Sequence, residues 1–164
     1  MIFTYRLVSL ILYPFLILLF FFRKILKKED KSRFKEKIFS SSIKGRIDCK
    51  HKLIWFHAAS VGEVQSIIPI IEKLNSDRTD LFFLITTITY TSGKLVEKEF
   101  KKNKKVSHRY LPLDINFLIK KFLDVWKPHA IFFIDSEIWP NLIKNIKKKK
   151  IPLALINGRI TYKT

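Results

Sequence analysis

The sequence predicts an α/β domain with a doubly wound, Rossmann-like parallel sheet, preceded by one transmembrane helix. Three observations lead to this prediction. Short apolar runs of strand length alternate with longer segments whose apolar residues repeat at helical spacing. Polar and small residues directly follow several of these runs. Near the amino terminus, a long uncharged stretch is followed by a cluster of basic residues.

The amino-terminal stretch Leu7–Phe22 contains no charged residue, and Ile2–Tyr5 extend it beyond Arg6. A helix needs about 20 residues to cross the hydrocarbon core, so this segment is long enough. A cleaved signal peptide is the alternative, but no small-residue cleavage site follows the apolar run. Basic residues follow instead and place the rest of the chain in the cytoplasm by the positive-inside rule. We therefore assign residues 1–28 to a membrane anchor with a basic flank.

The remaining chain divides into a connector, residues 29–51, and one domain, residues 52–164, within the 164 residues available. A short helix is expected in the connector at Lys31–Phe39. In the domain, strands are expected at Lys52–His57, Leu81–Thr87, Val106–Leu111, Ala130–Ile134 and Pro152–Ile156. Helical stripes lie between them, and right-handed crossovers would make the strands parallel. Asp114 is expected to cap the helix that follows it directly.

In such a sheet the ligand binds outside the carboxyl ends of the strands. Polar residues follow the expected strands at these ends, which makes this edge the predicted site. They are Ser60, Gly62 and Glu63, then Thr86 and Thr87 together with Thr91, Ser92 and Gly93, then Asp135, Ser136 and Glu137, and last Asn157 and Arg159.

Ser60-Val61-Gly62-Glu63 has two interpretations. It fits a capping box, in which Ser60 accepts from the Glu63 backbone and the Glu63 carboxylate reaches back. It also fits a catalytic carboxylate facing the crevice, with Gly62 allowing close approach of substrate. A helix amino terminus would keep Glu63 ionised, as a general base requires.

The acids of the second segment, Asp135-Ser136-Glu137, could bind sugar hydroxyls, orient another catalytic group or bind a metal, or the segment could form a solvated loop. The Arg159 guanidinium could bind phosphate or carboxylate. We expect no metal site, because the four histidines lack paired ligand spacing. The single cysteine, Cys49, excludes an internal disulfide.

The net charge of +18 suggests an anionic partner, although the lysine bias is also typical of an AT-rich genome. Neither a Walker loop nor a dinucleotide fingerprint is present. Phenylalanines dominate the aromatic residues and fall on expected strands and the anchor, so nucleic acid is not an expected partner.

Five segments in order along residues 52–160 resemble the transferases of 3-deoxy-D-manno-octulosonic acid (Kdo). The first is Trp55-Phe56-His57-Ala58-Ala59-Ser60-Val61-Gly62-Glu63. The others are Thr86-Thr87-Ile88-Thr89, Leu111-Pro112-Leu113-Asp114, Ser136-Glu137-Ile138-Trp139-Pro140-Asn141-Leu142 and Ile156-Asn157-Gly158-Arg159-Ile160. Asp135 departs from the pattern, since the family more often has Glu there, and its role stays open.

The resemblance implies the amino-terminal, acceptor-binding half of a two-domain GT-B glycosyltransferase on the cytoplasmic face of the bacterial inner membrane. Such an enzyme moves Kdo from CMP-Kdo to the lipid A precursor, with inversion and without a metal or other cofactor. Glu63 matches the family's proposed general base. Substrate binding is expected from Ser60, Gly62, Thr86, Thr87, Glu137, Asn157 and Arg159.

The donor-binding domain, which would contact CMP-Kdo, is expected to lie outside these 164 residues. We therefore expect no transfer by this chain alone. The alternative function is a membrane-tethered module that binds lipid or polyanions without chemistry.

Overall fold

The computed structural model describes residues 2–45, 50–135 and 139–157. Its centre is a five-stranded sheet in the order β3-β2-β1-β4-β5, and each neighbouring pair is parallel. The strands are β1 (Lys52–His57), β2 (Leu81–Thr87), β3 (Val106–Tyr110), β4 (Ala130–Ile134) and β5 (Leu153–Ile156). This confirms the predicted doubly wound sheet. The chain winds outward from β1 to β3 and then returns to the other side of β1, so the strand order reverses between β1 and β4.

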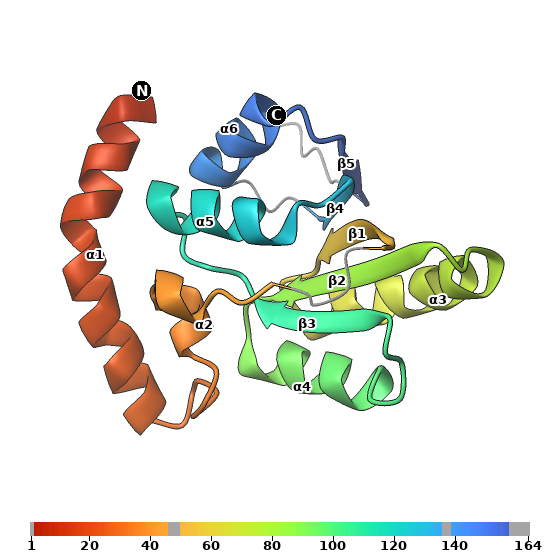
Figure 1. Cartoon of the computed structure of the whole chain (residues 1–164). Helices are drawn as coiled ribbons and strands as arrows, with labels where there is room; N and C mark the ends of the chain where they lie inside the picture. The colour runs from red at the N-terminus through yellow and green to blue at the C-terminus, as the bar shows by residue number, and fades with distance from the viewer. Residues whose placement is uncertain (1, 46–49, 136–138, 158–164) are drawn as a thin grey trace, which may run out of the picture.

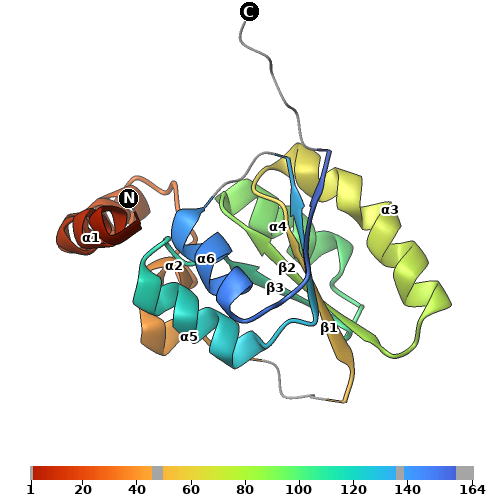
Figure 2. The ribbon, with the colours of Figure 1, turned by 90° about the horizontal axis from the view of Figure 1, so that it is seen from above.

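Helices cover both faces of the sheet, as Figure 2 shows. On one face lie α3 (Val61–Asp77) and α4 (Tyr90–Glu99); on the other lie α5 (Asn116–Trp126) and α6 (Pro140–Lys148). Successive side chains of β1 point to opposite faces of the sheet. Trp55 packs in the core cluster beneath α5 and α6, and Phe56 packs in the cluster beneath α3 and α4. Burial on both faces explains the apolar runs of the central strands β1, β2 and β4.

The expected connector packs against the domain through α2 (Lys35–Ile38) and a 3₁₀ turn, Ser40–Ser42. The α-helix is shorter than predicted. Two polar side chains of the connector bond to β3: Arg33 donates to the carbonyl of His108 (2.8 Å), and the Tyr110 N–H donates to Glu36 (3.0 Å). The side chains of Phe34 and Ile38 have no exposed surface. This segment is therefore part of the core rather than a free linker.

The predicted cap of α5 by Asp114 is wrong. Ile115 is the N-cap residue of α5, without a side-chain hydrogen bond. The Asp114 carboxylate instead accepts from the backbone N–H groups of Asn141 and Leu142, each at 2.9 Å, in the first turn of α6. The N-cap residue of α6 is Trp139, which has no side-chain cap bond, so a carboxylate from another segment satisfies those donors.

The amino-terminal helix α1 (Ile2–Ile25) runs alongside α2 and the amino ends of α5 and α6 (Figure 1). Its mean hydropathy reaches 2.1, and by length and composition it could cross a membrane. The Tyr5 hydroxyl donates to Asp114 (2.9 Å), and Arg6 Nε donates to the side chain of Asn141 (3.0 Å). The helix thus contacts the domain directly.

Candidate active site

The loop between β1 and α3 lies at the carboxyl edge of the sheet, where the strand order reverses. Ser60 is the N-cap residue of α3, and Glu63 lies in the first turn of that helix. Ligands of doubly wound domains bind at this switch point. The fold therefore places the predicted catalytic carboxylate where the topology alone would place a ligand.

Hydrogen bonds fix the Glu63 carboxylate in this loop. Oε1 accepts from the Ser60 hydroxyl and Oε2 from the Ala59 N–H, both at 2.7 Å. The Glu63 N–H donates in return to Ser60 Oγ at 3.3 Å. This confirms the predicted capping box, with one difference. Glu63 reaches the N–H of Ala59, one residue before the N-cap, so the carboxylate closes the whole turn.

The same turn is held from its other side by α4. The Ser92 hydroxyl donates to the carbonyl of Ala59 at 3.1 Å, and Ser92 has no exposed surface. The sequence places Ser92 among the polar residues expected at this edge but gives it no individual role. The available signal was a small polar residue at the start of an expected helix, which does not identify its partner. Ser92 therefore acts on Glu63 through the position of Ala59.

Gly62 leaves open space at the start of α3. A Cβ atom added there would have no heavy atom within 4 Å. At Gly93 in α4, by contrast, an added Cβ would lie 2.5 Å from the Tyr110 hydroxyl. The two glycines thus differ in kind. Gly93 is required by close packing, whereas the space at Gly62 is available to a ligand.

Thr86 and Thr87, at the end of β2, are fully buried. Thr86 Oγ1 accepts from the Trp55 indole N–H and lies 2.8 Å from His57 Nδ1. Thr87 Oγ1 lies 2.9 Å from His108 Nε2. Both threonines therefore support the floor of the site, and direct contact with substrate stays a prediction.

Burial determines the charge of both histidines. Removal from water lowers the pKa of His57 from its usual 6.5 to about 4. It also lowers the pKa of His108 to about 3, assisted by the nearby guanidinium groups of Arg33 and Arg109. Both imidazoles are consequently neutral at pH 7. These two histidines therefore add no positive charge to the floor of the site.

The ends of β4 and β5 are joined by Asp135 and Asn157. Asn157 Nδ2 donates to Asp135 Oδ1 at 2.9 Å. Both residues have left-handed backbone angles, with φ of 57° and 58°, which Asp and Asn tolerate better than most residues. Asn157 is exposed at the carboxyl edge, as predicted. The predicted residues Glu137 and Arg159 lie outside the described residues.

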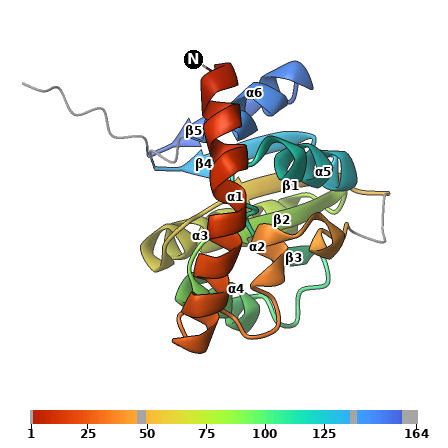
Figure 3. The ribbon, with the colours of Figure 1, turned by 90° about the vertical axis from the view of Figure 1, so that its left-hand side faces the viewer.

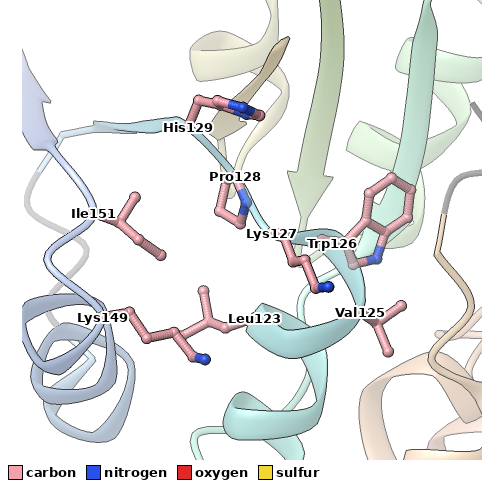
Figure 4. A pocket seen from close by; sticks show the side chains of 8 residues that line it. All are labelled: Leu123, Val125, Trp126, Lys127, Pro128, His129, Lys149 and Ile151. Atoms are coloured by element: carbon pink, nitrogen blue, oxygen red, sulfur yellow. The ribbon is translucent and has the colours of Figure 1, made fainter. Parts of the chain in front are cut away.

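A hollow of about 620 Å³ lies at the opposite edge of the sheet, where α5 ends and β4 begins (Figure 4). Its lining includes Trp126, Pro128 and Lys149 but none of the predicted site residues. Within residues 2–45, 50–135 and 139–157, no three His, Cys, Asp or Glu side chains converge as a metal site. The candidate site is therefore the exposed carboxyl edge around Glu63.

Comparison with known proteins identifies a family. Residues 31–164 match the model of the 3-deoxy-D-manno-octulosonic-acid transferase (kdotransferase) family. A probable mitochondrial 3-deoxy-D-manno-octulosonic acid transferase of Arabidopsis thaliana is 35% identical over 99% of the chain. The 3-deoxy-D-manno-octulosonic acid transferase of Rickettsia bellii is 35% identical over 98%, and that of Haemophilus influenzae is 36% identical over 68%.

These relatives are much longer than the chain. The aligned region covers 36% of the Arabidopsis protein, 37% of the R. bellii protein and 26% of the H. influenzae protein. The chain thus spans about a third of the length of the relatives that it matches throughout.

Proposed function

The chain belongs to the 3-deoxy-D-manno-octulosonic acid (Kdo) transferase family, and on this premise we propose that it is the acceptor-binding half of a glycosyltransferase. The proposed reaction moves Kdo from CMP-Kdo to a hydroxyl of the lipid A precursor, with inversion. We assign it no resident metal or cofactor, as the family resemblance implies. CMP-Kdo would bind to a second domain outside these 164 residues.

The position of Glu63 carries the proposal. Glu63 is half-exposed, and its carboxylate lies at the switch point of the sheet, where Ser60 and Ala59 orient it. In the proposed step, a new bond forms between the acceptor oxygen and the Kdo anomeric carbon. The bond from that carbon to the CMP phosphate oxygen breaks, and the acceptor hydroxyl proton passes to Glu63.

Capping and catalysis are compatible at Glu63. An ionised carboxylate offers about four acceptor positions on its two oxygens. The bonds from Ala59 N–H and Ser60 Oγ use one position on each oxygen, so each oxygen keeps one for a substrate hydroxyl. The capping bonds then orient the base and prevent it from turning away.

The other edge residues have proposed roles in acceptor binding. Gly62 allows the acceptor to approach the backbone of α3, because the space above it is open. Asn157, held by Asp135, presents its amide at the same edge. Glu137 is proposed to bind sugar hydroxyls, and Arg159 to bind a phosphate of the acceptor.

We further propose that the protein works at the cytoplasmic face of the bacterial inner membrane. The apolar helix α1 and the net charge of +18 support this location. Anionic headgroups attract lysines, and the acceptor itself is a phosphorylated lipid. Acceptor binding by the chain should therefore weaken as salt concentration rises.

Two measurements test the proposed function. In detergent, the 164-residue chain should bind the lipid A precursor saturably and should not transfer Kdo. Fused to the remaining two thirds of a curated relative, it should transfer Kdo from CMP-Kdo. Acceptor binding without transfer by a folded fusion that binds CMP-Kdo would favour the non-catalytic lipid-binding module instead.

A further inference from the structure

We propose that α1 lies in the plane of the membrane surface, with its outward face among the acyl chains, and does not cross the bilayer. This orientation differs from the transmembrane orientation that the apolar sequence of α1 alone predicts. The inference rests on the proposed membrane association but not on the transfer chemistry, so the two can fail separately.

The inward face of α1 is bonded to the domain along nearly its whole length. At its amino end, Tyr5 donates to Asp114. In the middle, the Tyr13 hydroxyl donates to the carbonyl of Ile38, and its ring packs edge-on against Phe117. Figure 3 shows α1 in front of the domain, crossing it from the level of α6 to that of α4.

The carboxyl end of α1 is fixed in the same way. Arg23 Nε donates to Glu29 at 2.8 Å, and Glu29 also pairs with the buried Lys37 of α2. The Phe21 ring packs edge-on against Phe34 at 5.3 Å between centroids. Both ends and the middle of the helix are therefore attached to the domain.

The length of this contact decides between crossing and lying flat. From Tyr5 to Arg23 the helix rises about 27 Å, close to the ~30 Å thickness of the hydrocarbon core. If α1 crossed in this arrangement, the domain beside it would enter the hydrocarbon with its exposed charged side chains, such as Lys35 of α2 and Lys120 of α5. Moving such charges from water into lipid costs several kcal/mol each, so crossing would instead require the contacts to break.

The outward face of α1 is a continuous apolar stripe without a charged residue. Its members are between 50% and 77% exposed: Phe3, Leu7, Leu10, Ile11, Phe15, Leu18, Phe22 and Ile25. Their spacing of three to four residues places them on one side of the helix. The surface of a soluble protein rarely exposes so large an apolar patch, so we expect another apolar surface to cover the stripe.

Basic residues beside the stripe identify the cover as a lipid surface. Lys27 and Lys28 are exposed and follow the carboxyl end of the stripe, where anionic headgroups would meet them. The arrangement also suits the proposed acceptor. Helix α1 contacts the amino ends of α5 and α6, which lie toward the same carboxyl edge of the sheet as Glu63. The headgroup of a lipid acceptor could then reach this edge while its acyl chains stay in the bilayer.

A topology measurement tests the proposal on the whole chain. A hydrophilic tag with one cysteine is placed before Met1 in a Cys49→Ser background, and Gln65→Cys on α3 serves as the reference position. A membrane-impermeant maleimide should label both cysteines in inverted inner-membrane vesicles and neither in intact spheroplasts. Labelling of the tag in spheroplasts would show that α1 crosses the membrane and would overturn the proposal.

A second measurement tests which face meets the lipid. Ile11→Lys and Phe15→Lys should each weaken binding to anionic phospholipid vesicles at least about tenfold without changing the thermal unfolding of the domain. Gln65→Lys, on the exposed side of α3, is the matched control and should bind as the wild type does. Unchanged vesicle binding by both outward variants would show that another partner covers the stripe.

Discussion

The backbone N–H of Asn141 donates a 2.9 Å hydrogen bond to the carboxylate of Asp114, 27 residues earlier in the chain. The side chain of Asn141 bonds in return to the Asp114 carbonyl at 2.6 Å. This relationship joins two segments that carry the family resemblance, Leu111–Asp114 and Pro140–Leu142. Part of the family's sequence pattern at these positions therefore serves the start of α6 and not substrate directly.

Replacing Asp114 with Ala should lower the free energy of unfolding by about 2 to 4 kcal/mol. The substitution leaves two buried N–H groups of α6 without an acceptor and removes the partner of Tyr5. Urea unfolding of the chain in detergent measures the change. Asp124→Ala is the matched control, because Asp124 is an exposed partner of Lys149 and should change stability by less than about 1 kcal/mol.

Stability should fall between pH 6.5 and pH 4 because of His57 and His108. In the folded state their pKa values are about 4 and about 3, against 6.5 when unfolded. In this window the unfolded chain binds up to two more protons, so lower pH favours unfolding. Between pH 7 and pH 5 each histidine should contribute a loss of about 2 kcal/mol.

The variants His57→Gln and His108→Gln isolate these contributions. Each variant should show a smaller difference between its unfolding free energies at pH 7 and pH 5 than the wild type. The comparison is made within each variant, so a general loss of stability does not affect it. An unchanged difference in both variants would contradict the assignment of neutral buried histidines.

The two glycines at the edge of the sheet should respond oppositely to alanine. Gly62→Ala should keep the unfolding free energy within about 1 kcal/mol, because its Cβ enters open space. It should lower kcat/KM for the lipid acceptor at least about tenfold in the active fusion. Wild-type kcat/KM in this variant would show that the acceptor does not approach Gly62.

Gly93→Ala is the contrasting variant. Its Cβ would lie 2.5 Å from the Tyr110 hydroxyl and 2.9 Å from His108 Cε1. Such crowding in a packed interior should cost about 1 to 3 kcal/mol of unfolding free energy. A stable Gly93→Ala protein would show that β3 and α4 can separate more easily than their packing indicates.

Much of the fold could be predicted from the sequence because its determinants are local. The bounds of β1, β2 and β4 follow from uninterrupted apolar runs, and Ser60 and Glu63 form their cap within a single turn. The switch point then follows from strand order and places Glu63 at the ligand edge.

The features that the sequence did not reveal depend on segments far apart in the chain. Asp114 caps α6 because folding brings the segment before α5 against Asn141, which no local pattern indicates. Thr86 and Thr87 look like edge residues in sequence. Only their neighbours on β1 and β3, His57 and His108, show that the hydroxyls are engaged inside the fold. The apolar composition of α1 likewise does not indicate that this helix contacts the domain.

The most direct test of Glu63 as the general base is Kdo transfer by the active fusion with Glu63→Gln, compared with Glu72→Gln on the exposed side of the same helix. Glutamine keeps the size and a hydrogen-bond acceptor of Glu63 but cannot take up the acceptor proton. For Glu63→Gln we expect a loss of turnover of at least about a hundredfold, with acceptor binding and folding retained, whereas Glu72→Gln should be fully active. Turnover by Glu63→Gln near that of the wild type would contradict the role of Glu63 as base and leave it as a helix cap.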